Sequence, residues 1–366
     1  MRRLTIQCLR QTYEVLIGLG LLDQPPKALL DFMAGRGTAI VTDRGLPLDH
    51  VERVYKALKA QCKMATVLHI KKGEQAKDMN TVLELAQELA RLRFDRADAM
   101  VALGGGTVLD IAGFVSAIYM RGIPYVNIPT TALAQADACI GGKVGINFGG
   151  GKNLLGSFYH PSLVMVDPSL VQTQTMDDLR SGLAEVAKAA IIGDKGLFAM
   201  LEHNAGALLS LKDPAALEDT LYRALRVKAI VVQEDEIEAG PRMKLNLGHT
   251  IGHALELLVK DQNPLAHGDA VAVGMMVASE IALNRGWLCP GDYTRIMDLL
   301  HLLAPAEHWK DLDSQAVVTA TGLDKKRRAG VLHVVLPLEI GHVKVVSDVT
   351  EQELIRAIER VKGHGP

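Results

Sequence analysis

Apolar and polar positions follow a regular order through the first half of the chain. Short apolar runs predict buried strands at residues 38–43, 65–70, 99–103, 125–129 and 163–167. Apolar residues at helical spacing predict helices between them, at residues 50–61, 79–92 and 108–119. Because alternating strands and helices form a parallel sheet covered by helices, the pattern predicts an N-terminal α/β domain.

After about residue 175 the helical spacing dominates. It predicts helices at residues 179–192, 195–211, 214–234, 249–260 and 269–285. Beyond them, only the short run at residues 331–336 is strand-like. We therefore expect two domains, residues 1–175 and residues 176–366, of which the second is mostly α-helical.

Composition narrows the class of protein. Hydrophobic residues make up 48% of the 366 residues, which excludes a disordered chain. The net charge of −2 argues against a nucleic-acid partner, since nucleic-acid binding normally requires a basic excess. The 34 glycines and the 4% aromatic content are typical of an α/β enzyme with backbone close to a ligand.

Cysteines and apolar segments indicate the compartment. The four cysteines are far apart and form no CxxC pair, so we expect neither a disulfide framework nor a thiolate zinc site. The N-terminal segment loses its apolar character too soon for a signal peptide, and the longest apolar stretch, residues 270–278, is too short to span a bilayer. These features predict a cytoplasmic protein with no membrane partner.

Two glycine-rich segments are candidates for ligand binding. Gly104, Gly105 and Gly106 stand between a predicted strand and helix, where backbone N–H groups can approach a phosphate. The third glycine of the dinucleotide fingerprint is replaced by Leu109, so a purely structural turn is the alternative. Asp43 ends an early strand and fits a ribose hydroxyl or a simple turn equally well.

The second segment, residues 141–153, superficially suggests a P-loop. Ile146 occupies a required glycine position and Asn153 the Ser/Thr position, which argues against an ATPase. Lys143, Lys152 and Asn153 in flexible backbone suit an anionic, hydroxylated ligand, and a solvated loop is the alternative.

Clustered histidines are the strongest chemical signal. His249, His253 and His267 fall within 19 residues, and the first two share a helix face. Two histidines and a carboxylate from another segment make an open metal site, and Glu185 lies with Lys188 in an apolar helical segment. The spacing is not HExxH, which argues against a zinc protease. Taken singly, each histidine also fits a structural or surface role.

Polar residues crowd the segment before the histidines. They are Lys228, Glu234, Asp235, Glu238, Arg242, Lys244 and Asn246. A solvated helix end is the alternative, and we accept it for Glu234 and Lys244. The charge run at residues 324–328 is most simply a solvent-exposed surface segment, although it could close over a phosphate.

Several long segments resemble one family. They are GGGTVLDIAGF (104–114), IPTTALAQADACIGGKVGIN (128–147), GKNLLGSFYHP (151–161), SGLAEVAKAAII (181–192), KLNLGHTIGHALE (244–256) and HGDAVAVGM (267–275). In this order they resemble the 3-dehydroquinate synthases of the sugar-phosphate cyclase superfamily, and the likeness runs from about residue 13 to 345.

The resemblance implies a fold and an activity. It implies a Rossmann-like nucleotide-binding domain, a mostly helical metal-binding domain and an active site in the cleft between them. The family binds NAD and one divalent metal, Zn²⁺ or Co²⁺, and acts as a homodimer on a small sugar phosphate. It is a lyase of the shikimate pathway that converts 3-deoxy-D-arabino-heptulosonate 7-phosphate to 3-dehydroquinate and phosphate. NAD transiently oxidises a ring hydroxyl, phosphate leaves, NADH returns the hydride, and an aldol step closes the ring.

Matched positions imply a residue set. The metal ligands are Glu185, His249 and His267. Substrate and catalytic residues are Lys143, Asn153, Lys188, Lys228, Glu238, Arg242, Asn246 and His253, with Arg121 from the dimer partner and either Lys325 or Lys326. NAD is expected near Asp43, Glu74, Lys77, Gly105, Gly106, Asp110, Thr130, Thr131, Asp137, Lys143, Lys152 and Thr173.

Some positions depart from the family pattern. Leu109 replaces a glycine, Ala76 an aromatic residue, Ala189-Ala190 a Tyr-Gly pair and Asp269 a glutamate. These departures leave room for a paralogue with another substrate.

Four other functions compete with this interpretation. The 2-deoxy-scyllo-inosose synthases typically lose the Gly-Gly-Lys of residues 141–143, and the epi-valiolone synthases usually lose the histidine at the position of His253. Both features are present here. A metal-dependent polyol dehydrogenase would need no lysine set such as Lys143, Lys152 and Lys228. A non-catalytic binding protein does not account for the full residue set.

Overall fold

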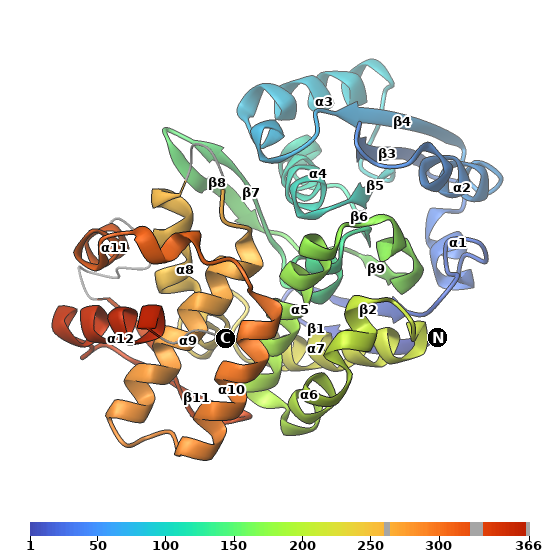
Figure 1. Ribbon diagram of the computed structural model, residues 1–366. Helices are drawn as coiled ribbons and strands as arrows, with labels where there is room; N and C mark the ends of the chain where they lie inside the picture. The colour runs from blue at the N-terminus through green and yellow to red at the C-terminus, as the bar shows by residue number, and fades with distance from the viewer. Residues whose placement is uncertain (260–263, 323–331, 364–366) are drawn as a thin grey trace. The chain divides into compact units, whose positions relative to one another are not determined.

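The computed structural model describes residues 1–259, 264–322 and 332–363 (Figure 1). The chain divides into an N-terminal unit, Met1–Thr173, and a C-terminal unit, Gln174–Pro366. Lys325 and Lys326 lie outside the described residues. Over the described ranges, every helix is too short or too polar to cross a membrane.

A seven-stranded sheet forms the centre of the N-terminal unit, with strand order β1-β2-β9-β6-β5-β3-β4. The strands are β1 (Arg2–Gln7), β2 (Thr12–Ile17), β3 (Gly37–Asp43), β4 (Met64–Ile70), β5 (Ala99–Gly104), β6 (Tyr125–Pro129) and β9 (Leu163–Val166). Only β1 and β2 pair antiparallel; every other pair in this sheet is parallel. The predicted parallel sheet is therefore confirmed. The sequence pattern missed β1, because it is an edge strand in which only Ile6 is buried.

The helices of this unit are α1 (Lys27–Met33), α2 (Leu48–Lys59), α3 (Met79–Arg91) and α4 (Gly106–Ile118). The predicted helix at residues 79–92 corresponds to α3. The Asp78 carboxylate caps it by accepting the Thr81 N–H, and Val82 and Leu89 are buried on its apolar face. α4 begins two residues after β5 ends, so the three-glycine turn lies at the N-terminus of a helix.

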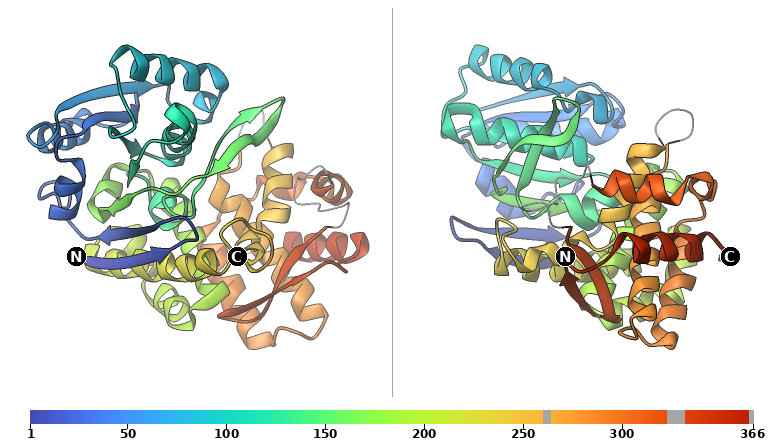
Figure 2. Two further views of the ribbon diagram at one scale, coloured as in Figure 1. Left: turned by 180° about the vertical axis from the view of Figure 1, so that it is seen from behind. Right: turned by 90° about the vertical axis from the view of Figure 1, so that its left-hand side faces the viewer.

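The glycine-rich segment at residues 141–153 is not flexible backbone, and that prediction is wrong. Most of it belongs to an antiparallel ribbon of β7 (Lys143–Phe148) and β8 (Gly151–Phe158), which extends away from the seven-stranded sheet (Figure 2). A Cβ on Gly145 would lie 2.6 Å from the Leu155 oxygen, so glycine permits the strands to approach. A high glycine content suggests a flexible loop, because composition does not show that two glycine-containing strands pair closely.

The C-terminal unit is mostly helical, as predicted. Its helices are α5 (Met176–Gly193), α6 (Lys195–Leu209), α7 (Pro214–Glu234), α8 (His249–Leu258), α9 (His267–Asn284), α10 (Pro290–Leu303), α11 (Ser314–Thr321) and α12 (Glu351–Gly363). The strand expected at residues 331–336 is described from Val334 and continues to Glu339 as β10. It pairs with β11 (His342–Val346), which the sequence pattern missed.

Glycines set the distance between α8, α9 and the start of α5. A Cβ on Gly274 of α9 would lie 1.8 Å from the Gly248 carbonyl oxygen, just before α8. A Cβ on Gly268 would lie 2.2 Å from the Ser181 Cα, and the Gly268 N–H donates to the Ser181 hydroxyl at 2.9 Å. Backbone therefore packs directly on backbone beside His249, Glu185 and His267.

α12 is held to α9 by Arg285, whose guanidinium donates to Glu353 at 2.7 Å and to Asp348 at 2.9 Å. The hydrogen bonds from Arg285, with smaller contributions from Thr350, lower the pKa of Glu353 to about 2. A carboxyl whose pKa is lowered on folding contributes stability above its ordinary pKa, and this contribution is lost as the pH falls towards 2.

We expect Glu353→Gln to reduce the free energy of unfolding by about 1–2 kcal/mol at pH 7, because charge-assisted hydrogen bonds are lost. The difference from the unaltered protein should shrink between pH 4.5 and the lowest pH at which the protein stays folded. Urea unfolding at several pH values measures this. Glu52→Gln, at an exposed pair with Lys56, is the control and should change little. A difference that is constant with pH would contradict the prediction.

Candidate active site

Three side chains from three helices of the C-terminal unit come together as a candidate metal centre. Glu185 lies on α5, His249 is the first residue of α8 and His267 the first of α9. One ligand atom from each lies within 4.8 Å of the others. Glu185 Oε1 is 3.7 Å from His249 Nε2 and 3.4 Å from His267 Nε2. The structure thus brings together the three residues that the sequence predicted as ligands.

The outer nitrogens of both histidines have acceptors beside them. His249 Nδ1 lies 3.1 Å from the Leu247 carbonyl oxygen, and His267 Nδ1 lies 3.4 Å from Glu256 Oε1. An acceptor at Nδ1 keeps the proton there and leaves the Nε2 lone pair for a metal. One carboxylate and two imidazoles oriented in this way fit Zn²⁺ or Co²⁺ with open positions for a substrate.

Neighbouring cationic groups compensate the charge of the Glu185 carboxylate. Glu185 forms an ion pair with Lys188, and their side chains are only 1% and 4% exposed. Burial lowers the pKa of His267, but hydrogen bonds with Glu185 and Glu256 outweigh it and raise the pKa to about 9. A divalent metal ion bound at this position would likewise compensate the charge of the Glu185 carboxylate.

His253, another predicted substrate residue, lies beside this cluster, and two predicted lysines are buried in the same unit. The His253 ring lies 5.5 Å from the His249 ring and 6.5 Å from the His267 ring. Lys188 on α5 and Lys228 on α7 are both buried cations. Buried ammonium groups of this kind suit an anionic substrate.

A tight loop after α7 carries the remaining residues. The Asp235 carboxylate accepts the N–H groups of Ala239, Gly240 and Arg242 at 2.8, 2.6 and 3.1 Å. These backbone hydrogen bonds outweigh burial and lower the pKa of Asp235. The loop presents the buried Arg242 and ends at Asn246, whose amide donates to Glu238 at 2.8 Å.

In the N-terminal unit, the three-glycine turn leads into α4. Gly105 is its N-cap residue and has no side chain to accept the first N–H groups of the helix, which are the groups that bind anions at a helix N-terminus. The Thr130 N–H donates to the Gly104 oxygen at 3.0 Å, and a Cβ on Gly105 would lie 3.1 Å from the Thr131 methyl group. The turn at Gly105 and Gly106 and the segment at Thr130 and Thr131, which follow neighbouring strands, therefore lie side by side. Leu109 is buried in α4, where its N–H donates to the Gly105 oxygen.

Lys77 connects three further predicted residues. Its buried ammonium group donates to Asp110 and to Asn153, each at 2.6 Å. Glu74 is 3.8 Å from the same ammonium group and accepts the Asn147 amide at 2.9 Å. This network ties the ribbon to the residues around the N-terminus of α4.

Five further predicted cofactor residues lie at other positions of the N-terminal unit. Asp43 Oδ1 accepts the Gly45 N–H at 2.6 Å at the end of β3, a local turn. Asp137 lies in the π-helical turn Ala134–Ala138. Lys143 and Lys152 are exposed on the ribbon, and Thr173 ends a 3₁₀ turn.

Backbone strain marks several of the same positions. Over the described ranges, six non-glycine residues have positive φ, and three of them are predicted site residues: Arg121, Asn153 and Glu238. Positive φ costs free energy for such residues and persists where the surrounding structure or function requires it. Arg121 is also exposed, next to Met120, which has positive φ as well.

The other departures from the family pattern lie in packed positions. Ala76, Ala189 and Ala190 are buried. Asp269 lies in the first turn of α9, where burial and the charge of Asp177 raise its pKa to about 6.

Two residues of the site were missed in the sequence, Glu256 as a partner of His267 and Asp235 as the loop anchor. Glu256 follows His249 and His253 at positions i+7 and i+3 of one helix, so its spacing was a usable signal. Asp235 gave no such signal, because its partners are backbone N–H groups.

Fold and site together define a class of protein, with a parallel-sheet unit that carries a glycine turn and a helical unit that carries a candidate carboxylate–histidine metal centre. The family model for the 3-dehydroquinate synthase N-terminal region matches residues 67–181, and the model for the C-terminal region matches residues 182–327. The 3-dehydroquinate synthase of Desulforamulus reducens is 39% identical over 96% of this chain and 97% of its own length. The chain therefore belongs to the 3-dehydroquinate synthase family.

A neighbouring activity is equally close in overall identity. The 2-epi-valiolone synthase of Actinosynnema mirum is 39% identical over 93% of this chain and 90% of its own. Among solved structures, a 2-epi-5-epi-valiolone synthase from Streptomyces hygroscopicus with NAD⁺ and Zn²⁺ bound is 31% identical, with a TM-score of 0.87, and the match covers 98% of this chain and 99% of that one. Identity alone does not select the substrate.

Proposed function

We propose that this protein is a 3-dehydroquinate synthase that converts 3-deoxy-D-arabino-heptulosonate 7-phosphate to 3-dehydroquinate and phosphate. The observation that carries the proposal is the centre formed by Glu185, His249 and His267, which has two oriented imidazoles and one carboxylate. It lies in a chain of the matching family. NAD and one Zn²⁺ or Co²⁺ are the cofactors that go with this function.

Each cofactor supplies one kind of chemistry when bound. When bound, NAD would accept a hydride from the ring carbon that bears a hydroxyl and later return it, and the divalent metal would make that hydroxyl more acidic. Glu185, His249 and His267 would hold the metal, and the Gly105–Gly106 turn at the α4 N-terminus would bind the pyrophosphate of NAD.

The chain's own residues bind and orient the substrate. Lys228 and Arg242 would bind its anionic groups, because both are cations held in buried positions. Asn246, fixed by Glu238, would donate to a substrate hydroxyl. His253 would take and return the hydroxyl proton during the transient oxidation, beside the His249 ring.

Two features favour this substrate over those of the sister cyclases. The chain retains the Gly-Gly-Lys of residues 141–143 and the histidine at 253, which the inosose and epi-valiolone synthases respectively tend to lose. The lysines at 143, 152 and 228 favour a phosphorylated substrate over the simple alcohol of a polyol dehydrogenase. The second candidate, an epi-valiolone synthase, is supported by the 39% identity to such an enzyme.

Phosphate release is the direct test. Purified protein with NAD and Zn²⁺ should release phosphate from the heptulosonate phosphate and accumulate no net NADH. Sedoheptulose 7-phosphate and glucose 6-phosphate serve as matched substrates for the two sister activities. Faster release from sedoheptulose 7-phosphate would replace the proposal with the epi-valiolone activity, and net NADH with polyols would favour a dehydrogenase.

We also propose a homodimer in which Arg121 serves the partner's active site, which its exposure and positive φ support. Arg121→Ala and Glu185→Gln should each be inactive alone. Mixed dimers contain one complete site, so re-equilibrated mixtures should recover about a quarter of normal activity. A monomer in analytical ultracentrifugation, or no recovery on mixing, would contradict the proposal.

A further inference from the structure

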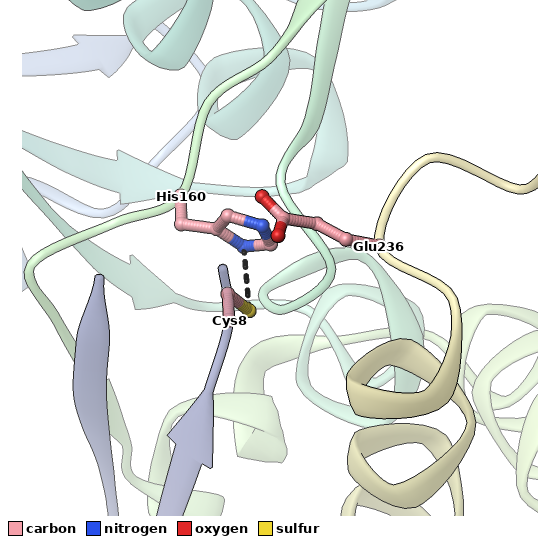
Figure 3. Close-up of side chains that lie close together, drawn as sticks. All are labelled: Cys8, His160 and Glu236. Carbon is pink, nitrogen blue, oxygen red and sulfur yellow. Dashed lines mark hydrogen bonds between the residues drawn. The ribbon is translucent and has the colours of Figure 1, made fainter. Parts of the chain in front are cut away.

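A cysteine and a histidine of the N-terminal unit form a pair that the proposed reaction does not use. Cys8 Sγ lies 3.9 Å from His160 Nδ1, and the two side chains point toward each other (Figure 3). Cys8 is half-buried and follows β1, whereas His160 is buried and follows β8. An imidazole that can accept a thiol proton generates the thiolate, which is the nucleophilic form of cysteine.

The position of His160 is fixed from two sides. Tyr13 of β2 stacks on the imidazole with ring centroids 5.6 Å apart. The Gln11 side-chain amide donates to the carbonyl oxygens of His160 and Pro161 at 3.0 and 2.9 Å, while the Gln11 backbone carbonyl oxygen accepts the Cys8 N–H at 3.0 Å. One short turn thus holds both members of the pair, and this arrangement favours repeated proton transfer between them.

The same imidazole packs against the turn that precedes Lys143. Gly142 has φ +66°, and a Cβ placed on it would lie 2.7 Å from His160 Nδ1. The Gly141 N–H donates to the Tyr13 hydroxyl at 3.4 Å, and the Tyr159 N–H donates to the Gly142 oxygen at 2.7 Å. The ring therefore has no room to move towards Gly142 without displacing this backbone.

We propose that Cys8 is a nucleophilic thiol activated by His160, a modification site for small electrophiles, and that an adduct on its sulfur displaces the Gly141–Lys143 backbone. Haloacetamides and hydrogen peroxide are electrophiles of this class. The effect on activity rests on the proposed function, in which Lys143 is one of the lysines that favour a phosphorylated substrate. The reactivity of Cys8 does not depend on it.

The chemistry balances with either electrophile. With iodoacetamide, a sulfur–carbon bond forms, the carbon–iodine bond breaks and iodide leaves, while His160 takes the thiol proton and passes it to water. With hydrogen peroxide, the sulfur attacks one oxygen and the O–O bond breaks. The sulfur is oxidised to a sulfenic acid, and the peroxide is reduced to water with the proton that His160 took.

The other three cysteines are internal comparators. Cys139 is buried, and burial raises the pKa of the half-buried Cys62 thiol despite its hydrogen bond with Thr38. Cys289 is exposed at the N-terminus of α10, so on accessibility alone it should react first. If Cys8 reacts before Cys289, its reactivity must come from activation of the thiol, because Cys289 is the more exposed of the two.

Timed alkylation of the full-length protein with iodoacetamide at pH 7, followed by peptide mass spectrometry, is the first test. We expect Cys8 to be modified about tenfold or more faster than Cys289. His160→Gln should bring the rate at Cys8 down to that of Cys289 or below. Equal or faster modification of Cys289 in the unaltered protein would overturn the proposal, whether or not the variant folds.

Hydrogen exchange and phosphate release test the consequence of the adduct. Alkylated protein should exchange the amides of residues 141–148 faster and lose most of its phosphate release. Cys8→Ser should keep normal exchange and activity and resist the reagent. Full modification of Cys8 with unchanged exchange would refute the displacement. If alkylation changes the hydrogen exchange but the unaltered protein releases no phosphate, the proposed function is wrong and the proposal for Cys8 stands.

Discussion

Replacing Glu185 by Gln is expected to abolish metal binding and to lower phosphate release by roughly 10³-fold. The carboxylate is the one anionic ligand of the centre, and it faces both His249 and His267. Metal-assisted charge stabilisation amounts to several kcal/mol, and each 1.4 kcal/mol changes a rate by about tenfold. Isothermal titration with Zn²⁺ and the visible spectrum of the Co²⁺ form measure the loss independently of activity.

The control must separate metal loss from damage to the fold. Glu185→Gln also leaves the buried Lys188 without its carboxylate, which on its own destabilises the protein by about 3–5 kcal/mol. The double variant Glu185→Gln/Lys188→Met removes both charges and should recover most of the stability, but none of the metal affinity. Asp298→Asn, an exposed acid on α10, should change neither quantity. Normal Zn²⁺ affinity in the double variant would show that the ligand assignment is wrong.

Gly274→Ala is expected to give the largest loss of stability from a single added methyl group. Its Cβ would lie 1.8 Å from the Gly248 carbonyl oxygen and 2.7 Å from the carbonyl carbon, so backbone must shift. Forced repacking of this kind costs about 1–3 kcal/mol and occasionally more. Since His249 follows Gly248 directly, Zn²⁺ affinity should fall together with the free energy of unfolding. Urea unfolding and zinc titration measure the two quantities.

Gly206→Ala is the matched control for this prediction. Gly206 lies inside α6, and apart from the nearby backbone of the helix itself, no described atom would lie within 4 Å of an added Cβ. Alanine in a helix interior is favoured over glycine by up to about 1 kcal/mol, so this variant should be as stable as the unaltered protein or more stable. A neutral Gly274→Ala would mean that α8 and α9 do not need backbone contact to place their histidines.

The fold was predictable where burial follows a local period. α3 and α4 and the parallel strands β3 to β6 were predicted because their apolar residues recur at helical spacing or in short buried runs. The edge strand β1 and the ribbon β7–β8 were not predicted, because they bury little apolar surface or pair through glycines. These strands are stabilised by residues distant in sequence, and a pattern read over a short stretch of the chain does not include those residues.

The candidate site divides in the same way. His249 and His253 could be paired from the sequence, because four residues make one helical turn. The carboxylate partner Glu185 was assigned only through resemblance to a family. The role of Asp235 depends on backbone donors four to seven residues further along, and composition does not reveal it.

By itself, the sequence determined the alternation of strands and helices, the helical character of the second half, and the residue types that can bind a metal, a nucleotide and an anionic substrate. Hydrophobic periodicity and side-chain chemistry are local properties, so they can be read along the chain. Only the tertiary structure decided that Glu185, His249 and His267 lie within 4.8 Å of one another. The physical reason lies at Gly248, Gly268 and Gly274. Because glycine has no Cβ, α5, α8 and α9 approach closely enough there to bring the three side chains together.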